Sequence, residues 1–228
     1  MIKLIVSEPG EGKTAAMMKD ILRFSEDTCF VNWKTYGLPN CVRLKTDHIF
    51  REVEKSDGKM GKAVNWDFWT NAIKKHGGFH IFMDEIQQIV HSRRSSSGFN
   101  TLFSQWISQI RKVTGSNENK HFYAVSQRMH NIDPAIRDLA TVVIVPSKKQ
   151  GYSVPTVIRS EGKRYIRDIP RTQIRLTYFT GADCVSKYEH WKMSGLKIYD
   201  FRTMFWANGY FKYYDAYEFG DFGNMEYL

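Results

Sequence analysis

The stretch Ser7-Glu-Pro-Gly-Glu-Gly-Lys-Thr14 combines residue types that can bind phosphate. Its two glycines let the backbone fold its N–H groups around phosphate oxygens. Lys13 is long enough to reach the β- and γ-phosphates of a nucleotide, and the Thr14 hydroxyl can ligate Mg²⁺. The usual pattern G-x-x-x-x-G-K-[ST] starts with glycine, whereas this chain has the small residue Ser7 there. The alternative is an ordinary glycine-rich turn between a strand and a helix.

Two adjacent acids, Asp84 and Glu85, follow the apolar run Ile81-Phe-Met. An acid at the tip of a buried strand can hold Mg²⁺ through water, and a second carboxylate directly after it can polarise an attacking water. A kinase that transfers phosphate to another substrate needs no such second carboxylate, so Glu85 favours hydrolysis. The alternative is a solvated strand end, followed by a helix over Glu85–Val90 that Glu85 caps.

A third polar group, Ser126-Gln127-Arg128, ends the strand predicted over His121–Ser126. If that strand lies beside the first strand of the chain, Gln127 faces the γ-phosphate and can sense its presence. A Ser-Gln strand end is common by itself. This group indicates a nucleotide site only because it follows the other two groups at a suitable separation in the sequence.

These groups need a sheet that brings the strand ends together. Strands are expected over Ile2–Val6, Thr28–Trp33, Cys41–Leu44, Phe79–Met83, His121–Ser126 and Thr141–Val145. Helices are expected over Lys13–Phe24, Trp66–His76, residues 102–113 and Pro134–Leu139, and loops over Ser56–Lys62 and His91–Asn100. This alternation of strand and helix predicts a three-layer α/β fold with a mostly parallel central sheet.

The character of the chain changes after Pro146, so we divide it into a core of residues 1–146 and an extension of residues 147–228 packed on it. The extension begins with a basic ribbon: from Ser147 to Arg175 there are eight Lys or Arg and two acids. Strands are expected there over Thr156–Ser160, Lys163–Arg167 and Gln173–Phe179.

The last part of the extension, Tyr199–Leu228, holds twelve aromatic residues, with five acids and two bases. Such aromatic residues can stack on nucleic-acid bases. However, the acids at Asp215, Glu218 and Asp221 would repel a phosphate backbone. We therefore expect this segment to pack across the core or at a subunit interface.

The composition excludes several classes of protein. The chain has 228 residues, of which 42% are hydrophobic and 25% charged, so it is not a disordered chain. No apolar run is long enough for a membrane span, and no signal peptide is recognisable. Three cysteines without metal-ligand spacing predict free thiols in a reducing compartment and no structural zinc. A net charge of +9 makes a polyanion a reasonable partner.

In order and type, the phosphate-binding loop, Asp84-Glu85 and Ser126-Gln127-Arg128 resemble the FtsK–HerA superfamily of DNA-pumping P-loop ATPases. Within it, the chain resembles viral genome-packaging ATPases and the zonula occludens toxin (Zot)-like proteins of filamentous phage assembly. The stretches MDEIQQIVHSRR, WISQIRKVTG and FYAVSQRMHNIDPAIRDLA are particularly similar to the Zot-like pattern. The resemblance covers roughly residues 1–146 and implies a RecA-like fold.

The resemblance implies ATP and Mg²⁺ as cofactors. The residues that would bind the nucleotide are Pro9, Gly10, Glu11, Gly12, Lys13, Thr14 and Ala15. Thr14 and Asp84 would hold the metal ion, Glu85 would activate water, and Gln127 would act as the sensor.

The resemblance also implies a homo-oligomeric ring, usually a hexamer, in which an arginine of one subunit completes the site of its neighbour. The candidates are Arg93, Arg94, Arg111, Arg128 and Arg137. We favour Arg111 and Arg128, because rigid elements position a charge better than loops do.

The first expectation for function is an ATP-driven motor that packages double-stranded viral DNA, gripping the phosphates without reading the sequence. The second is a Zot-like phage assembly ATPase; such proteins carry a membrane segment and a further domain, neither of which we expect in this chain. Capsid-vertex or membrane-associated viral proteins are expected as partners, and the cytoplasm of the infected host cell, or the virion, as the location. A nucleotide or small-molecule kinase and a non-catalytic nucleotide-binding module are further alternatives.

Overall fold

A computed structural model describes residues 1–54, 56, 58–89, 98–113, 120–149, 153–160 and 163–214. Its strands are β1 Ile2–Val6, β2 Thr28–Val31, β3 Cys41–Arg43, β4 Phe50–Glu54, β5 Met60–Val64, β6 Phe79–Met83, β7 Phe122–Ser126, β8 Val142–Lys149, β9 Ser153–Ser160, β10 Lys163–Pro170, β11 Gln173–Thr180 and β12 Phe201–Trp206. Its α-helices are α1 Lys13–Arg23, α2 Thr46–Ile49, α3 Trp66–His76, α4 Gly98–Val113, α5 Pro134–Asp138 and α6 Cys184–Ser194. Short 3-10 helices lie at Ile86–Gln88, Met129–Asn131 and Phe211–Tyr213.

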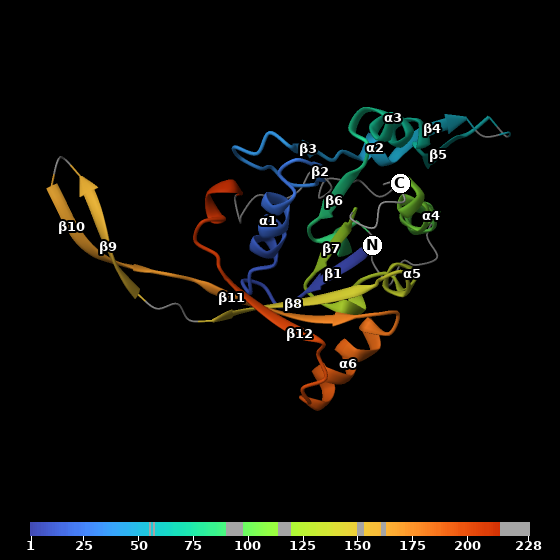
Figure 1. Cartoon of the computed structure of the whole chain (residues 1–228). Coiled ribbons are helices and arrows are strands. Elements are labelled where there is room, and N and C mark those ends of the chain that lie inside the picture. Colours follow the sequence, from blue (N-terminus) through green and yellow to red (C-terminus); the bar gives the residue numbers. More distant parts are fainter. Residues whose placement is uncertain are drawn as a thin grey trace.

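One eight-stranded sheet organises the molecule, in the order β12-β11-β8-β1-β7-β6-β2-β3 (Figure 1). The six strands from β8 to β3 in this order are parallel. At one edge of the sheet, β11 pairs antiparallel with β8, and β12 pairs antiparallel with β11. The predicted α/β fold with a mostly parallel sheet is confirmed.

The central strands of the sheet are buried on both faces, which gives three layers. In β6, Ile81 and Met83 belong to one hydrophobic cluster and Phe82 to another. The first cluster contains residues of α3, α4, α5 and α6, and the second contains residues of α1. Since successive residues of a strand point to opposite faces, a strand covered on both sides is apolar throughout, as predicted for Phe79–Met83.

A loop predicted over Ser56–Lys62 is in part a strand, so that prediction was wrong. β5 pairs antiparallel with β4, from Glu54 opposite Met60 to Phe50 opposite Val64. Charged residues on both strands obscure the alternation that would identify them. The turn lies between the strands, where Gly58 has a φ of +76°.

The main sheet contains residues on both sides of position 146. β8 runs from Val142 to Lys149 and pairs with β11 along its whole length. In the chain, β9 and β10 lie between β8 and β11, and they form a two-stranded antiparallel ribbon that projects from the body of the molecule (Figure 1). α6 lies between β11 and β12 in the chain and was not anticipated from the sequence. The division into two units at residue 146 stays a prediction.

The described end of the aromatic segment packs on the core. Tyr210, Tyr213 and Tyr214 are partly buried against the cluster that contains α1. The backbone N–H of Tyr36 donates to the carbonyl of Tyr213 at 2.9 Å, and Thr35 forms a β-bridge with Tyr214. The interpretation as a packing segment agrees with these contacts, whereas Asp215, Glu218 and Asp221 lie outside the described residues.

No helix in the described ranges combines the length and the apolar composition that crossing a membrane requires. Cys29 and Cys184 are buried free thiols, and Cys41 is only partly buried.

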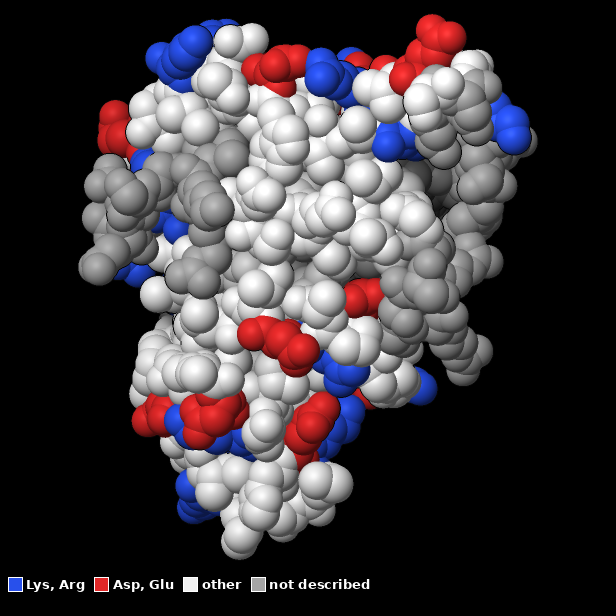
Figure 2. Space-filling model, turned by 90° about the vertical axis from the view of Figure 1, so that its right-hand side faces the viewer, with Lys and Arg blue, Asp and Glu red and all other residues white. Residues whose placement is uncertain are grey.

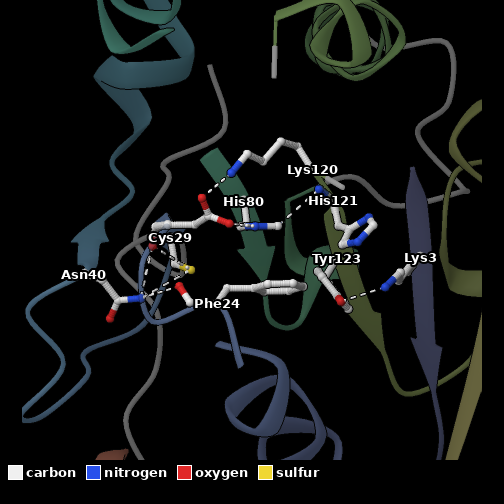
Figure 3. A network of polar contacts seen from close by, with 9 residues as sticks. Lys3, Phe24, Cys29, Asn40, His80, Lys120, His121 and Tyr123 are labelled. Carbon is white, nitrogen blue, oxygen red and sulfur yellow. Dashed lines mark hydrogen bonds and ion pairs between the residues drawn. The ribbon is translucent and has the colours of Figure 1, made fainter. Parts of the chain in front are cut away.

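A polar network surrounds His80 at the amino ends of the strands (Figure 3). His80 is fully buried, and its Nε2 lies 3.0 Å from Asp27 Oδ2. Its Nδ1 accepts from the backbone N–H of His121 at 3.3 Å, so the proton of the neutral ring lies on Nε2. Phe24 stacks on the ring at a centroid distance of 3.8 Å, and Lys120 also donates to Asp27.

This network holds two histidines in the neutral form. Burial is the main cause that lowers the pKa of His121 to about 3, and the charge of Lys3 and the nearby His80 ring contribute to the same shift. Burial also lowers the pKa of His80, although its hydrogen bond to Asp27 opposes that shift. An unfolded histidine takes up a proton near pH 6.5, so the unfolded state binds more protons than the folded state below that pH.

We therefore expect the free energy of unfolding to be highest above pH 6.5 and to fall as the pH is lowered from about 6.5 toward 3. His121 contributes at most about 1.4 kcal/mol per pH unit, reduced by solvent screening. Urea unfolding at pH 7.5, 6.0 and 5.0 measures this slope, and His121→Gln should flatten it. His130→Gln, at an exposed position, is the control. An unchanged slope in His121→Gln would contradict the assignment.

Candidate active site

The loop between β1 and α1 depends on two glycines in left-handed conformations. Gly10 has a φ of +80° and Gly12 a φ of +93°. Residues with a Cβ rarely adopt such angles. Gly12 is the N-cap of α1, and its carbonyl accepts the N–H of Ala16 at 3.0 Å. The loop therefore ends at a helix N-terminus, where backbone N–H groups and the helix dipole favour an anion.

Lys13 lies inside this loop and is only 7% exposed. Its Nζ donates to the carbonyl oxygens of Ser7 at 2.9 Å and Glu8 at 3.1 Å. The ammonium group is thus already directed into the concave side of the loop. A phosphate group there would offer it charged acceptors, which form stronger hydrogen bonds than carbonyls do.

Thr14 and Asp84 meet although they lie 70 positions apart in the sequence. The Thr14 hydroxyl donates to Asp84 Oδ2 at 2.9 Å. Burial raises the pKa of the Asp84 carboxyl above its usual range, and the hydrogen bond from Thr14 opposes this shift. A cation beside the carboxyl would favour its charged form. One hydroxyl and one carboxylate oxygen in contact fit a Mg²⁺ ion that keeps several waters.

Asn32, directly after β2, holds the backbone of Asp84 and was missed by the sequence analysis. Its Oδ1 accepts from the N–H of Asp84 at 2.7 Å, and its Nδ2 donates to the carbonyl of Asp84 at 2.9 Å. Asn32 is 3% exposed, so these two bonds are shielded from water. The sequence offered only a weak signal, an asparagine within the otherwise apolar end of the strand predicted over Thr28–Trp33.

Glu85 has the one positive φ of any non-glycine residue in the described ranges, +50°. Its backbone N–H donates to Asp84 Oδ1 at 2.9 Å, which closes the turn after β6. Gln127 Nε2 lies 3.4 Å from both carboxylate oxygens of Glu85, and Gln87 donates to one of them. Strained backbone of this kind occurs at functional sites, where the surrounding contacts hold it.

The strand order explains how Gln127 reaches Glu85. β7 lies between β1 and β6, and all three are parallel. Their carboxyl ends therefore meet at one edge of the sheet, which is where α/β proteins bind ligands. The predicted neighbourhood of the first strand and the strand before Gln127 is confirmed. Lys13, Thr14, Asp84, Glu85 and Gln127 all lie at this edge.

The remaining loop residues have different surroundings. Pro9 and Gly10 are exposed, and Ala15 is fully buried beneath the loop. The carboxylate of Glu11 accepts from the backbone N–H of Lys148 at 2.6 Å. That contact joins the loop to β8, beyond residue 146, and had no signal in the sequence.

The candidate arginines are not equally placed. Arg128 is exposed two residues after the end of β7, and its backbone N–H donates to the Ser126 hydroxyl at 3.3 Å. Arg137 on α5 lies 3.7 Å from Glu189 on α6 of the same chain. Arg111 lies in α4, with its side chain outside the described part, and Arg93 and Arg94 lie outside the described residues.

The family model for AAA, the ATPase family associated with various cellular activities, matches residues 4–147. This segment holds all five residues that meet at the sheet edge. The chain belongs to the AAA family. It is thus a P-loop ATPase. No curated protein matches this AAA chain in sequence.

Two similar solved structures were found at low identity. The N-terminal domain of zonular occludens toxin from Neisseria meningitidis gives a TM-score of 0.50 at 15% identity, covering 94% of this chain and 98% of that chain. The genome packaging NTPase B204 from Sulfolobus turreted icosahedral virus 2, in complex with ATP-gammaS, gives 0.45 at 12% identity, covering 92% and 93%. The first likeness supports the fold of this AAA chain and no more.

We expect Asn32→Ala to lower both the stability and the rate of nucleotide hydrolysis. The substitution leaves the buried N–H of Asp84 without its acceptor, which costs about 1–3 kcal/mol, and it frees the Asp84–Glu85 turn. Thermal unfolding and steady-state phosphate release measure the two effects.

Asn40→Ala is the matched control, because the Asn40 side chain likewise makes two hydrogen bonds to the backbone, donating to two carbonyls at 3.1 Å each, but at the amino ends of the strands. It should lose stability and keep its turnover when folded. Equal turnover in folded Asn32→Ala and folded Asn40→Ala would show that Asn32 does not position the site.

Proposed function

We propose that this chain is an ATP-hydrolysing motor that moves DNA without reading its sequence, and that its main use is to drive double-stranded viral DNA into a capsid. The observation that carries the ATPase part is the contact of Thr14 with Asp84 at 2.9 Å, directly beside Glu85 and its amide neighbours.

In this proposal Lys13 binds the β- and γ-phosphates of ATP, and Thr14 and Asp84 hold Mg²⁺. The metal ion neutralises charge on the phosphates when it is bound. Glu85 accepts a proton from the attacking water, and the Gln127 and Gln87 amides orient the Glu85 carboxylate. The positive φ of Glu85 directs this carboxylate away from the line of β6 toward β7.

The DNA part of the proposal rests on the ribbon of β9 and β10. Residues 147–175, which include this ribbon, have six more basic than acidic residues, and the ribbon projects from the body (Figure 1). The molecular face turned away from the ribbon has few charged residues across the middle of its described part (Figure 2). Contacts of Lys and Arg with phosphates do not depend on the base sequence of the DNA.

We further propose that copies of the chain form a ring, with a hexamer as the expected size. An arginine from one subunit would then stabilise the charge that develops on the phosphate bound by its neighbour. We favour Arg128 for this role, because it is exposed at the same sheet edge as Gln127. Arg137 is the weaker candidate, since its own chain supplies Glu189 as a partner.

The second candidate is a Zot-like phage assembly ATPase. It is suggested by the N-terminal domain of zonular occludens toxin, which is similar in fold over 94% of this chain. Both candidates use the same chemistry and differ in partners: capsid-vertex proteins for packaging, membrane-associated viral proteins for assembly. We place either motor in the cytoplasm of the infected host cell, with the virion as a second location.

Glu85→Gln should keep nucleotide binding and lower turnover about 10²- to 10⁴-fold, the usual contribution of a general base. Lys13→Ala should weaken nucleotide binding about 10- to 100-fold, since a charged hydrogen bond contributes about 1.5–3 kcal/mol. Fluorescent-nucleotide titration and phosphate release measure these effects. Wild-type turnover in Glu85→Gln would overturn the mechanism.

The DNA part is tested by ATP turnover with duplex DNA, single-stranded DNA or no DNA. A packaging motor should be stimulated by duplex. Replacing Arg159, Lys163, Arg164 and Arg167 together by Gln should reduce the slope of log affinity against log salt by about 0.9 per lost phosphate contact. Lys74→Gln with Lys75→Gln, exposed on α3, is the control. Turnover that depends on a small-molecule acceptor instead of DNA would indicate a kinase.

A further inference from the structure

The phosphate-binding loop touches the base of the projecting ribbon at two points. The first is the hydrogen bond from the backbone N–H of Lys148 to Glu11 Oε2, at 2.6 Å. The second is the packing of Ile174 on Gly12, where an added Cβ would lie 2.3 Å from Ile174 Cδ1. Ile174 is 1% exposed, so this contact is buried.

These two points form one connection. Glu11 and Gly12 are neighbours in the loop, and Lys148 and Ile174 are directly opposite each other in the β8–β11 pair. β8 leads toward β9, and β10 returns through residues 171–172 to β11 (Figure 1). The strands that carry the ribbon therefore rest on the loop just before they leave the sheet.

A bound phosphate group would give the loop a second arrangement. Lys13 donates to the carbonyls of Ser7 and Glu8, which precede Glu11 in the same loop. The charged oxygens of a phosphate group would compete with these two carbonyls for the N–H donors of the Lys13 ammonium group. When Lys13 turns to the phosphate, the two carbonyls are released and the backbone between them and Gly12 can shift. Coupling between sites requires such an element with two arrangements.

We infer that nucleotide binding moves the β9–β10 ribbon relative to the sheet, through Glu11 on Lys148 and Gly12 on Ile174. The inference rests on the proposed function for its use, since the ribbon is the proposed DNA contact, but the movement itself needs no DNA. Glu11 is then a positioning residue that acts through its carboxylate on β8. Ile174 transmits the movement because Gly12 leaves it no free space.

The movement can be measured as a distance between two spin labels. One label is placed on the ribbon at residue 164 and one on α3 at residue 75, both exposed positions, as Arg164→Cys and Lys75→Cys. Cys41→Ser removes the one native thiol of the three that is not buried. Double electron–electron resonance is recorded with and without Mg²⁺ and saturating ATP-gammaS.

We expect the distance distribution to shift with nucleotide in the otherwise unaltered chain. Glu11→Ala removes the acceptor of the Lys148 N–H and should abolish the shift, whereas Glu11→Gln keeps an acceptor oxygen and should preserve it. Glu8→Ala removes the same charge from the same loop and should also preserve the shift. Ile174→Val, which keeps a branched side chain, and Ile174→Ala should reduce it progressively. Nucleotide affinity is measured for each variant, so that saturation is assured.

The outcomes separate the inference from the proposed function. No shift in the unaltered chain, or an equal shift in Glu11→Ala and Ile174→Ala, overturns the inference. A shift that depends on these contacts, together with no binding of duplex DNA, supports the coupling and overturns the DNA motor. Where duplex does bind, nucleotide should change its affinity about 5- to 150-fold, and DNA should change nucleotide affinity by the same factor.

Discussion

The hydrogen bond from Thr14 to Asp84 is the contact on which the rest of this structure depends. It joins the first residues of α1 to the end of β6, across the position of β7 in the sheet. It can form only if β1, β7 and β6 are parallel and in register, because their carboxyl ends must then lie at one edge. The buried apolar strands between the two helix layers therefore serve a positional purpose as well as a stabilising one.

The carboxyl and amino ends of the parallel strands form two edges of the sheet with different roles. At the carboxyl edge, polar groups are held in strained or desolvated states: Glu85 has a left-handed backbone and Asp84 a raised pKa. At the amino edge, the network gives both ring nitrogens of His80 a hydrogen-bond partner and keeps two histidines neutral (Figure 3). A rigid amino edge of this kind can compensate for the cost of the strained site.

Much of the fold was predictable because local patterns coincide with tertiary burial. Phe79–Met83 is apolar at every position because helices cover both faces of its strand. α3 begins and ends where predicted, since Asn65 caps its start and Gly77, with a φ of +65°, ends it. The β4–β5 hairpin was missed, because its strands carry charge on both faces and depend on each other for pairing.

The sequence alone determined the chemistry of the site: a phosphate-binding loop with Lys13 and Thr14, the acids Asp84 and Glu85, and Gln127 at a strand end. Those residues are recognisable because each follows its own strand within a few positions. Only the tertiary structure decided that Asn32 supports Asp84, that Gln87 joins Gln127 on Glu85, and that Glu11 contacts β8. The contacts of Asn32 with Asp84, Gln127 with Glu85 and Glu11 with β8 join segments that are distant in the sequence, and the order of the strands in the sheet, which brings them together, cannot be read from local residue patterns.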